Sequence, residues 1–367
     1  TIGVYRQMVD NAIGSRLSHI QIHQPGFTDY MDVEKTIPGG ADILQKVKSA
    51  PGVEAAAGRI VTGGMASSPA SVSGVTVMGV HPESEIPLTD IDQSVISGDY
   101  FQTRKRNPAV IGEKLAEKLN VDVGNKIVIT TQNTAGDIAA GAFRIVGIYK
   151  TVNSQFDERH VFVRQQDIAR ILEIGDNIHE IAVLLQDEQA VPGFAASLQE
   201  EYPQLKVSDW KELAPDLELL VEMSDQTLYI YMLIILLALV FGITNTMLMS
   251  VMERVRELGV VMALGMKGSR IFAMILLETV MLTLVGTVLG IAIAVPSILY
   301  FGKVGIDIAG VAEGAASFGI SAVMYPELPA GDYFQVIVLV AVTALVAAVY
   351  PGIKAVKMQP AEAIRKY

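Results

Sequence analysis

The sequence VMERVRELGVVMALGMKGSRIFAMILLE, residues 251–278, lies between two long apolar segments. Its central residues, 253–270, carry four basic and two acidic side chains. No charged residue occurs in 226–252 before it or in 279–302 after it. Each flanking segment is long enough to cross a bilayer as a helix, since about 20 residues span the hydrocarbon core. The charged stretch is therefore expected to lie outside the lipid and to join two spanning helices.

A third uncharged apolar run, residues 333–353, follows towards the C-terminus. The chain is 51% apolar with a mean hydropathy of +0.40, and residues 1–225 contain no run of this kind. This excess at one end predicts an N-terminal α+β domain joined to an α-helical membrane domain. The expected domains are residues 19–225 and 226–367, with spans at 228–251, 271–300 and 333–353.

Basic residues predict the orientation of the chain. The stretch 253–270 has four of them and the tail after residue 353 has four more, including Arg365 and Lys366, whereas residues 303–332 have only Lys303 against four acids. By the positive-inside rule, the stretch and the tail are expected in the cytoplasm. Residues 1–225 and 303–332 are then expected on the outer side.

The first residues, TIGVYRQMVDNAIGSRL, place Ile2, Tyr5, Met8 and Ile13 near helical spacing. An outward N-terminal domain needs a means of delivery, yet the chain begins at Thr1 without a signal peptide. We interpret residues 1–18 as the outward extension of a first spanning helix that precedes Thr1. Four spans are then expected, of which three are visible. The alternative is an unrelated surface helix.

The charge balance of the N-terminal domain excludes some partners. Residues 1–225 carry 19 Lys and Arg against 31 Asp and Glu, a net charge of −12, which leaves +1 for the rest. An exposed domain this acidic argues against nucleic acid as a partner. The chain has no cysteine, so it has no disulfide framework and no thiol chemistry.

Two strand, helix, strand units with similar spacing lie about 160 residues apart in the N-terminal domain. The first runs from HIQIHQ at residue 19 through ADILQKVKSA to VEAAAGRIVTGGMAS, and the second from HEIAVLLQD at residue 179 to LKVSDW. They are expected to form one layered lobe. Between them, strand-like and turn-like segments predict an inserted β-rich lobe at about residues 75–174.

No sequence motif indicates catalysis or a bound cofactor. His19 and His23 fall with Gln21 on one face of a predicted strand, which indicates a solvated face rather than a metal site because a third ligand is missing. LGMKGS, residues 264–269, lacks the G-x-x-x-x-G-K-[ST] pattern of a phosphate loop, and no strand precedes it. If ATP drives this protein, another chain must bind it.

Several polar and small residues lie within the apolar runs. Gly286 and Gly290 form a G-x-x-x-G pattern that allows close helix packing, either with another subunit or within this one. Thr244 and its polar neighbours Asn245 and Thr246 are expected to join helices rather than line a transport path. Glu278, near the end of its span, is expected to snorkel or to be paired.

The charged stretch itself predicts a short amphipathic helix at residues 253–265. Val255, Leu258 and Met262 share its apolar face, and Arg254 and Glu257 lie beside them. Gly259 and Gly265 are expected to break the helix. Such an element suits contact with another protein in the cytoplasm, whereas a mere turn between spans would need only a few residues.

The stretch ERVRELGVVMALGMKGSRIFAMILLETVMLTLVGTVLG closely resembles the signature of the FtsX-like permeases, the MacB and LolCDE family of ABC transporters. The ending YPGIKAVKMQPAEAIRKY resembles the C-terminus of that family. AVIGEKLAEKLNVDVGNKIVI, followed by FRIVGIYKT, looks like its periplasmic domain. KVSDW, with Trp210 as the only tryptophan, resembles the lipoprotein-releasing LolC and LolE permeases more than MacB.

The resemblance implies a multi-pass protein of the bacterial inner membrane whose large periplasmic domain has Porter-like and Sabre-like lobes. It implies a permease subunit that binds no cofactor, pairs with an identical or different permease, and works by mechanotransmission on two ATPase subunits that hold ATP and Mg²⁺. Residues 253–265 would be the coupling helix that the ATPase contacts. A periplasmic chaperone or adaptor and membrane lipids are further partners. The expected function is lipoprotein extraction, with MacB-like efflux of peptides or antibiotics, or FtsX-like regulation of cell-wall hydrolases, as alternatives.

Overall fold

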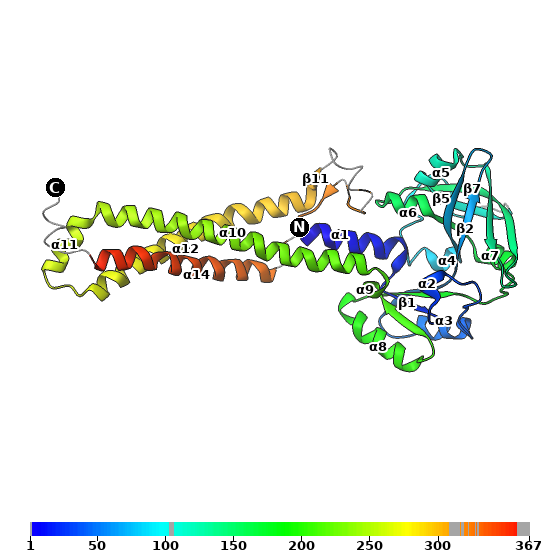
Figure 1. Cartoon of the computed structure of the whole chain (residues 1–367), viewed down its shortest axis with the longest axis horizontal. Helices are drawn as coiled ribbons and strands as arrows, with labels where there is room; N and C mark the ends of the chain where they lie inside the picture. The colour runs from blue at the N-terminus through cyan, green and yellow to red at the C-terminus, as the bar shows by residue number, and fades with distance from the viewer. Residues whose placement is uncertain are drawn as a thin grey trace. The chain divides into compact units, whose positions relative to one another are not determined.

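The computed structural model of the protein describes residues 2–102, 106–307, 316, 319–321, 323–326, 328 and 330–357. The tail residues 358–367, with Arg365 and Lys366, and parts of the loop 303–332 lie outside the described residues. The chain divides into two compact units (Figure 1). The α/β unit comprises Arg6–Leu220 and Asp307–Val323, and the helical unit comprises Thr1–Tyr5, Val221–Ile306 and Met324–Tyr367.

Among its described residues, the α/β unit contains ten strands and several short helices. Its strands are β1 (Ile20–His23), β2 (Val53–Ser67), β3 (Val72–Val80), β4 (Val95–Gly98), β5 (Pro108–Gly112), β6 (Lys126–Gln132), β7 (Ile138–Tyr149), β8 (His160–Arg164), β9 (Glu180–Leu185) and β10 (Lys206–Asp209). Its helices after the N-terminal segment are α2 (Phe27–Tyr30), α3 (Gly40–Lys48), α4 (Pro82–Glu85), α5 (Glu113–Leu119), α6 (Ser154–Arg159), α7 (Gln165–Leu172), η2 (Glu188–Ala190), α8 (Val191–Glu201) and α9 (Trp210–Leu213).

The two expected strand, helix, strand units interleave in one antiparallel sheet with the order β10-β1-β9-β2. The first unit supplies β1, α3 and β2, and the second supplies β9, α8 and β10. Because β9 lies between β1 and β2, each unit is a split βαβ motif. Apolar residues of the strands and of α3 and α8 form a single core, which includes Ile20, Ile43, Val183 and Leu198. We call this part the split-βαβ lobe.

The inserted segment forms a closed ring of strands. β2 pairs with β3, β3 with β8, β8 with β5, β5 with β7, β7 with β6, and β6 again with β2. The inward side chains alternate along the strands, as in Ile127 and Ile129 of β6, and pack with Phe143 and Val161 into one buried cluster. β4 extends the sheet beyond β7. We call this part the barrel lobe.

The long strand β2 belongs to both lobes. Its first half, up to Arg59, pairs with β9, and its second half, from Ile60, pairs with β3. The sequence predicts a strand here but assigns it to the split-βαβ lobe alone. The insertion therefore begins in the middle of a strand rather than at a linker.

Caps and turns fix the ends of the short helices. The Asn153 side chain accepts hydrogen bonds from the backbone N of Gln155 (3.0 Å) and Phe156 (3.1 Å) and so begins α6. Asp209 caps α9 in the same way through the backbone N of Glu212, at 3.0 Å.

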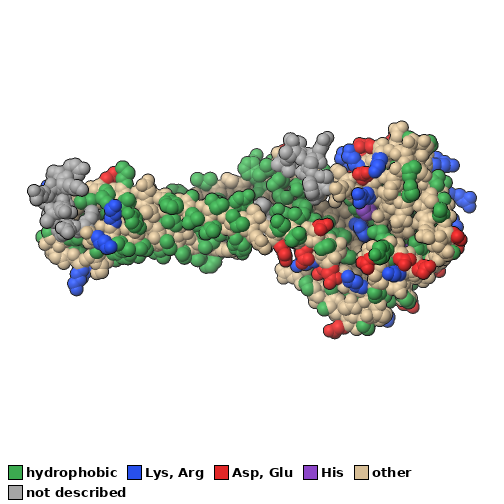
Figure 2. Space-filling view, viewed as in Figure 1, with side chains coloured by type: hydrophobic (Ala, Val, Ile, Leu, Met, Phe, Trp, Pro, Cys, Tyr) green, Lys and Arg blue, Asp and Glu red, His purple; other side chains and the backbone are tan. Residues whose placement is uncertain are grey.

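The helical unit contains long apolar helices. α10 (Pro215–Glu253), which begins in the α/β unit, α12 (Gly268–Val304) and the segment Tyr333–Val356 of α14 (Ala330–Val356) are long and apolar enough to cross a membrane. The short α11 (Val255–Ala263) joins α10 to α12, and β11 (Ile306–Asp307) pairs with β12 (Val323–Met324). Figure 2 shows hydrophobic side chains over most of this unit and basic side chains near α11.

The N-terminal residues are helical, as expected. α1 (Ile2–Ala12) continues into the π-helical turn η1 (Ile13–Leu17). Its interpretation as the continuation of a preceding span stays a prediction.

Candidate functional site

α11 is a separate short helix between two long ones. α10 ends at Glu253, Arg254 breaks the helical geometry with φ −98° and ψ 15°, and α11 begins at Val255. Gly265 ends the turn with φ +96°, a conformation that favours glycine. Gly259, in contrast, lies buried inside α11, so the expectation that it breaks the helix was wrong.

The predicted apolar face of α11 points into the helical unit. Leu258 is only 6% exposed and packs in a cluster with Met247 and Val251 of α10, Ile271 and Ile275 of α12, and Ala355 of α14. Met262 packs against the same cluster. Leu258 was expected to contact a partner protein, but it packs inside the helical unit. The ends of α10, α12 and α14 provide the apolar surface that covers it.

Other residues of α11 and the following turn remain exposed. Leu264 is 83% exposed, Val260 is 44% exposed and Met266 is 37% exposed. Arg256 and Glu257 are also exposed. α11 and the turn after it therefore expose apolar side chains next to charged ones, and we call these residues the exposed surface. The sequence signal for this exposed surface was the apolar residues directly before and after Gly265.

An ion pair ties the start of α11 to α12. Arg254 Nη1 lies 2.9 Å from Glu278 Oε1. Glu278, expected to snorkel or to be paired, is thus paired with a residue of the charged stretch. Both side chains are substantially exposed, so the pair fixes geometry more than it adds stability.

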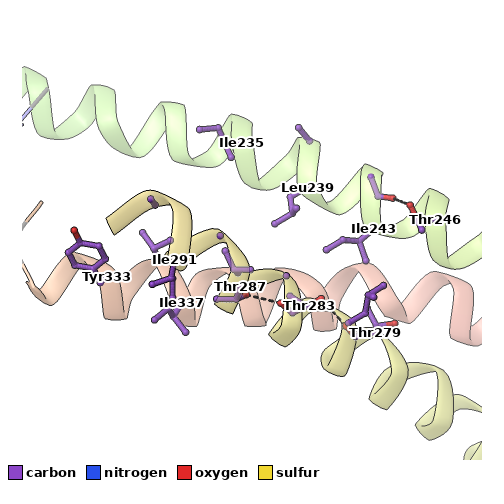
Figure 3. Close-up of a pocket in the computed structure, with 18 of the residues that line it drawn as sticks. Ile235, Leu239, Ile243, Thr246, Thr279, Thr283, Thr287, Ile291, Tyr333 and Ile337 are labelled. Carbon is purple, nitrogen blue, oxygen red and sulfur yellow. Dashed lines mark hydrogen bonds between the residues drawn. The ribbon is translucent and has the colours of Figure 1, made fainter. Parts of the chain in front are cut away.

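A wide apolar groove of about 820 Å³ lies between α10, α12 and α14. In Figure 3, Ile235, Leu239 and Ile243 of α10 face Thr283, Thr287 and Ile291 of α12, with Tyr333 and Ile337 of α14 beside them. The only polar groups drawn there are hydroxyls. Such a lining suits hydrocarbon or another helix rather than a charged solute.

Small residues line the α12 side of this groove. The hydroxyls of Thr283 and Thr287 each donate to the carbonyl oxygen four residues earlier, at 2.8 Å (Figure 3). Thr279 donates in the same way to Ile275, also at 2.8 Å. A Cβ added at Gly286 or Gly290 would meet nothing within 4 Å. Among the described residues, no neighbouring helix packs on this G-x-x-x-G pattern, and its role in packing stays a prediction.

Thr244 joins two helices of the unit. Its Oγ1 donates to the carbonyl oxygen of Ala347 in α14, at 3.1 Å, as expected of a polar residue that links helices. Thr246 instead bonds within α10, to the carbonyl oxygen of Gly242.

The histidines of the first strand are buried, so the prediction of a solvated strand face was wrong. His23 Nε2 lies 3.2 Å from Glu180 Oε2, and its ring stacks on Phe27. His19 Nδ1 accepts a hydrogen bond from the backbone N of Leu185, at 3.0 Å. Burial would raise the pKa of Glu180, but the hydrogen bond from His23 and the charge of Arg59 hold it at about 2. Glu180 lies 157 residues from His23, which local pattern does not reveal.

Within the part of the chain that the structure describes, no group of three His, Asp or Glu side chains is placed to hold a metal ion. LGMKGS forms the end of α11 and the turn into α12. A phosphate loop follows a strand, whereas LGMKGS follows the helix α11.

The fold and this site define a class of protein: an α/β domain followed in the chain by helices long and apolar enough to cross a membrane, with a short amphipathic helix between two of them. The chain belongs to the family of FtsX-like permeases of ABC transporters. Residues 229–360 match the FtsX-like permease C-terminal domain, and residues 1–201 match the MacB-like periplasmic core domain.

Individual relatives share the family at low identity. The lipoprotein-releasing system transmembrane protein LolC of Neisseria meningitidis serogroup B is 22% identical over 349 residues, 91% of this chain and 83% of that protein. The macrolide export ATP-binding/permease protein MacB of Escherichia coli O157:H7 is 41% identical over 78 residues, 20% of this chain and 12% of that protein. The solved periplasmic region of MacB from Actinobacillus actinomycetemcomitans is 12% identical, covers 58% of this chain and 98% of that one, and gives a TM-score of 0.36.

Proposed function

We propose that the chain is the permease subunit of an ABC transporter that extracts lipoproteins from the bacterial inner membrane. It would cross that membrane several times, with the α/β unit on the periplasmic side and α11 in the cytoplasm. The excess of basic residues in 253–270 supports this orientation. Similarity to LolC over most of the chain supports the lipoprotein substrate.

The observation that carries the coupling role is the exposed surface of α11 and the turn after it. Leu264 and Val260 are apolar side chains outside the apolar runs, and Arg256 and Glu257 flank them. A groove on a separate ATPase subunit would cover these residues, since burying a leucine contributes about 1.5–3 kcal/mol. In this proposal the ATPase subunit contacts this exposed surface, and Leu258 does not take part in the contact. Arg254, Val255, Leu258 and Met262 would hold α11 against the long helices, and Gly259 and Gly265 would allow its close packing and its turn.

ATP and Mg²⁺ would be held by the ATPase subunit and not by this chain. Hydrolysis would move α11, and the long helices would pass this movement to the α/β unit as mechanotransmission. A second permease, identical or different, would complete the transporter, and a periplasmic chaperone or adaptor would receive the substrate. The apolar groove beside Gly286 and Gly290 would contact lipid acyl chains or a helix of the second permease.

Substitution of the exposed surface tests the coupling. We expect Leu264→Asp to weaken co-purification with a co-expressed ABC ATPase subunit, or stimulation of its ATP hydrolysis, by roughly tenfold or more. Ile138→Asp is the matched control, because Ile138 is also 83% exposed but lies in the α/β unit. Equal ATPase coupling in the two variants would remove α11 from this role.

The substrate is tested in proteoliposomes that contain the chain, the ATPase subunit and a triacylated lipoprotein. ATP-dependent release of the lipoprotein is expected. MacB-like efflux is the second candidate, favoured by the 41% identity over 78 residues, and it predicts transport of a peptide or macrolide without lipoprotein release. Release of neither, together with activation of a cell-wall hydrolase, would support the regulatory alternative.

A further inference from the structure

A small cavity in the α/β unit gathers polar atoms that have no partner. It has a volume of about 270 Å³ and lies between the N-terminal segment α1–η1 and the helix α6 with the start of β8, and Leu217 and Gly319 also line it. Three of its lining residues carry a buried polar atom without a hydrogen-bond partner among the described residues: Asn11 Nδ2, Arg16 Nε and His160 Nε2. Buried polar atoms are paired in the large majority of cases, so three such atoms at one cavity point to a ligand.

Arg16 brings a positive charge to the cavity. Within the described chain, its guanidinium forms no ion pair and donates no hydrogen bond, whereas its carbonyl oxygen accepts a bond from Arg59 Nη1 at 2.7 Å. Burial lowers the pKa of the Arg16 guanidinium; the charge of Glu180 opposes this shift and that of Arg59 adds to it. Arg16 is partly buried, with Nε fully enclosed. Partial burial of a cation without a close counter-ion is costly, and an anion in the cavity would relieve this cost.

His160 offers an acceptor rather than a donor. Its Nδ1 lies 3.0 Å from the carbonyl oxygen of Phe156, which can only accept, so Nδ1 carries the proton. Burial, and then the charge of Arg16, lower the pKa of His160 to about 3, so the ring is neutral and Nε2 is an acceptor. The ring is fixed by stacking on Phe156, with centroids 4.1 Å apart. Nε2 therefore requires a ligand that donates a hydrogen bond.

We propose that this cavity binds a small oxyanion that keeps one hydroxyl oxygen, of the class of hydrogen phosphate and phosphomonoesters. Its charged oxygens accept from Arg16 and from the Asn11 amide, and its hydroxyl donates to His160 Nε2. Arg159, exposed among the lining residues, adds a second positive charge. The cavity is much larger than the roughly 30 Å³ that a water molecule occupies in the liquid, so it has room for such an anion.

Titration calorimetry of the full chain in detergent, in a buffer without phosphate, tests the site. At about pH 6, inorganic phosphate is expected to bind at least about tenfold more tightly than sulfate, which has no hydroxyl. Arg16→Gln should weaken phosphate binding by at least about tenfold, since a hydrogen bond to a charged group is lost. The exposed Arg106→Gln, outside the cavity, should leave it unchanged. No measurable binding of phosphate, or equal binding of phosphate and sulfate, would overturn the proposal.

Two further variants separate the roles of the lining residues from effects on folding. His160→Phe keeps a ring against Phe156 and should reduce the preference for phosphate over sulfate to about one. Ser15→Cys places a single thiol in the cavity wall of this cysteine-free chain. Phosphate should slow the alkylation of this thiol in Ser15→Cys, but not in the combined Ser15→Cys, Arg16→Gln variant. An alkylation rate of Ser15→Cys that does not change with phosphate would contradict the site.

Glycerol 3-phosphate identifies the source of the anion. Its second pKa is about 6, so near pH 6 a large share of the ester keeps its hydroxyl. Tighter binding of the ester than of inorganic phosphate assigns the site to a phosphomonoester, and the opposite order assigns it to free phosphate. A phosphodiester headgroup has no hydroxyl on phosphorus, and binding of glycerophosphocholine as tight as that of phosphate would contradict the role of His160.

Discussion

Arg59 binds Glu85 through two parallel hydrogen bonds in the interior of the α/β unit. Nη2 lies 2.6 Å from Oε1 and Nε lies 3.1 Å from Oε2, and both side chains are fully buried. The remaining amino group, Nη1, donates to Glu180 at 2.8 Å. One guanidinium thus compensates two carboxylates from α4 and β9 at the point where β2 passes from one lobe to the other.

Removal of Arg59 is expected to be strongly destabilising. Arg59→Leu leaves two carboxylates buried without their counter-ion, which typically costs about 3–5 kcal/mol. Lys118→Leu removes an exposed ion pair with Glu158 and should cost no more than about 1 kcal/mol. Urea unfolding followed by the fluorescence of Trp210, the single tryptophan, measures both. Similar midpoints for the two variants would contradict a structural role of the network.

Asp157 should make the α/β unit less stable as the pH rises. Burial raises its pKa to about 7, although hydrogen bonds from Thr151 oppose this rise. Because the pKa of Asp157 in the folded chain lies above its ordinary value of 3.8, the stabilising contribution is complete below pH 3.8 and is lost as the pH rises through about 7. Asp157→Asn should flatten this part of the stability profile and gain stability over the original chain at about pH 8. The exposed Asp122→Asn is the control, and an equal change in both variants would rule out this cause.

Truncation of Leu258 should destabilise the chain strongly, whereas truncation of Leu264 should have almost no effect on stability. Leu258→Ala opens a cavity between α11 and the long helices and should cost about 2–5 kcal/mol. Leu264→Ala changes an exposed side chain and should stay within about 0.5 kcal/mol. Thermal unfolding of the chain in detergent checks the order. A stable Leu258→Ala variant would mean that α11 is not packed as described.

Gly286 of α12 and Gly352 of α14 should also differ in their response to a larger side chain. Gly286→Leu has nothing within 4 Å of the new Cβ and should leave the chain as stable as before while filling the groove. At Gly352, a Cβ would lie 2.7 Å from Cδ2 of Phe272, so Gly352→Leu should destabilise by about 1–3 kcal/mol. Comparable melting temperatures of the two variants would show that the face of Gly286 is packed within the chain.

A charge swap tests the link between α11 and α12. Glu278→Arg alone brings two cations together and should impair ATPase coupling, whereas Arg254→Glu with Glu278→Arg should restore most of it. The effect on stability should remain below about 1 kcal/mol, because both groups are exposed to more than a third. Failure of the double variant to recover would place the role of Arg254 outside this pair.

Periodicity and charge predicted the main elements. The uncharged runs predicted the long helices α10, α12 and α14, and the alternating segments predicted the strands of both lobes. The charged stretch predicted the short helix α11 between two long ones. Each of these signals lies within one segment of the chain.

The errors concern contacts that are distant in sequence. A helical wheel identifies the apolar face of α11 but not what that face contacts. An apolar residue such as Leu258 could pack either on a partner protein or on the neighbouring helix ends. The local sequence predicts a solvated His23 because its buried partner, Glu180, lies in another strand, 157 residues away. The local sequence assigns β2 to one lobe because its pairing with β3, which begins at Val72, is not visible in the sequence of β2 itself.

The shared strand β2 has a mechanical consequence. It is 15 residues long, about 50 Å at 3.3 Å per residue, and its backbone is bonded into both lobes without an intervening linker. A hinge needs a few residues whose backbone torsions are free to change, and every such change here would break ladder hydrogen bonds in one sheet or the other. Under the proposed function, a displacement of either lobe would therefore reach the other through β2 with little bending between them.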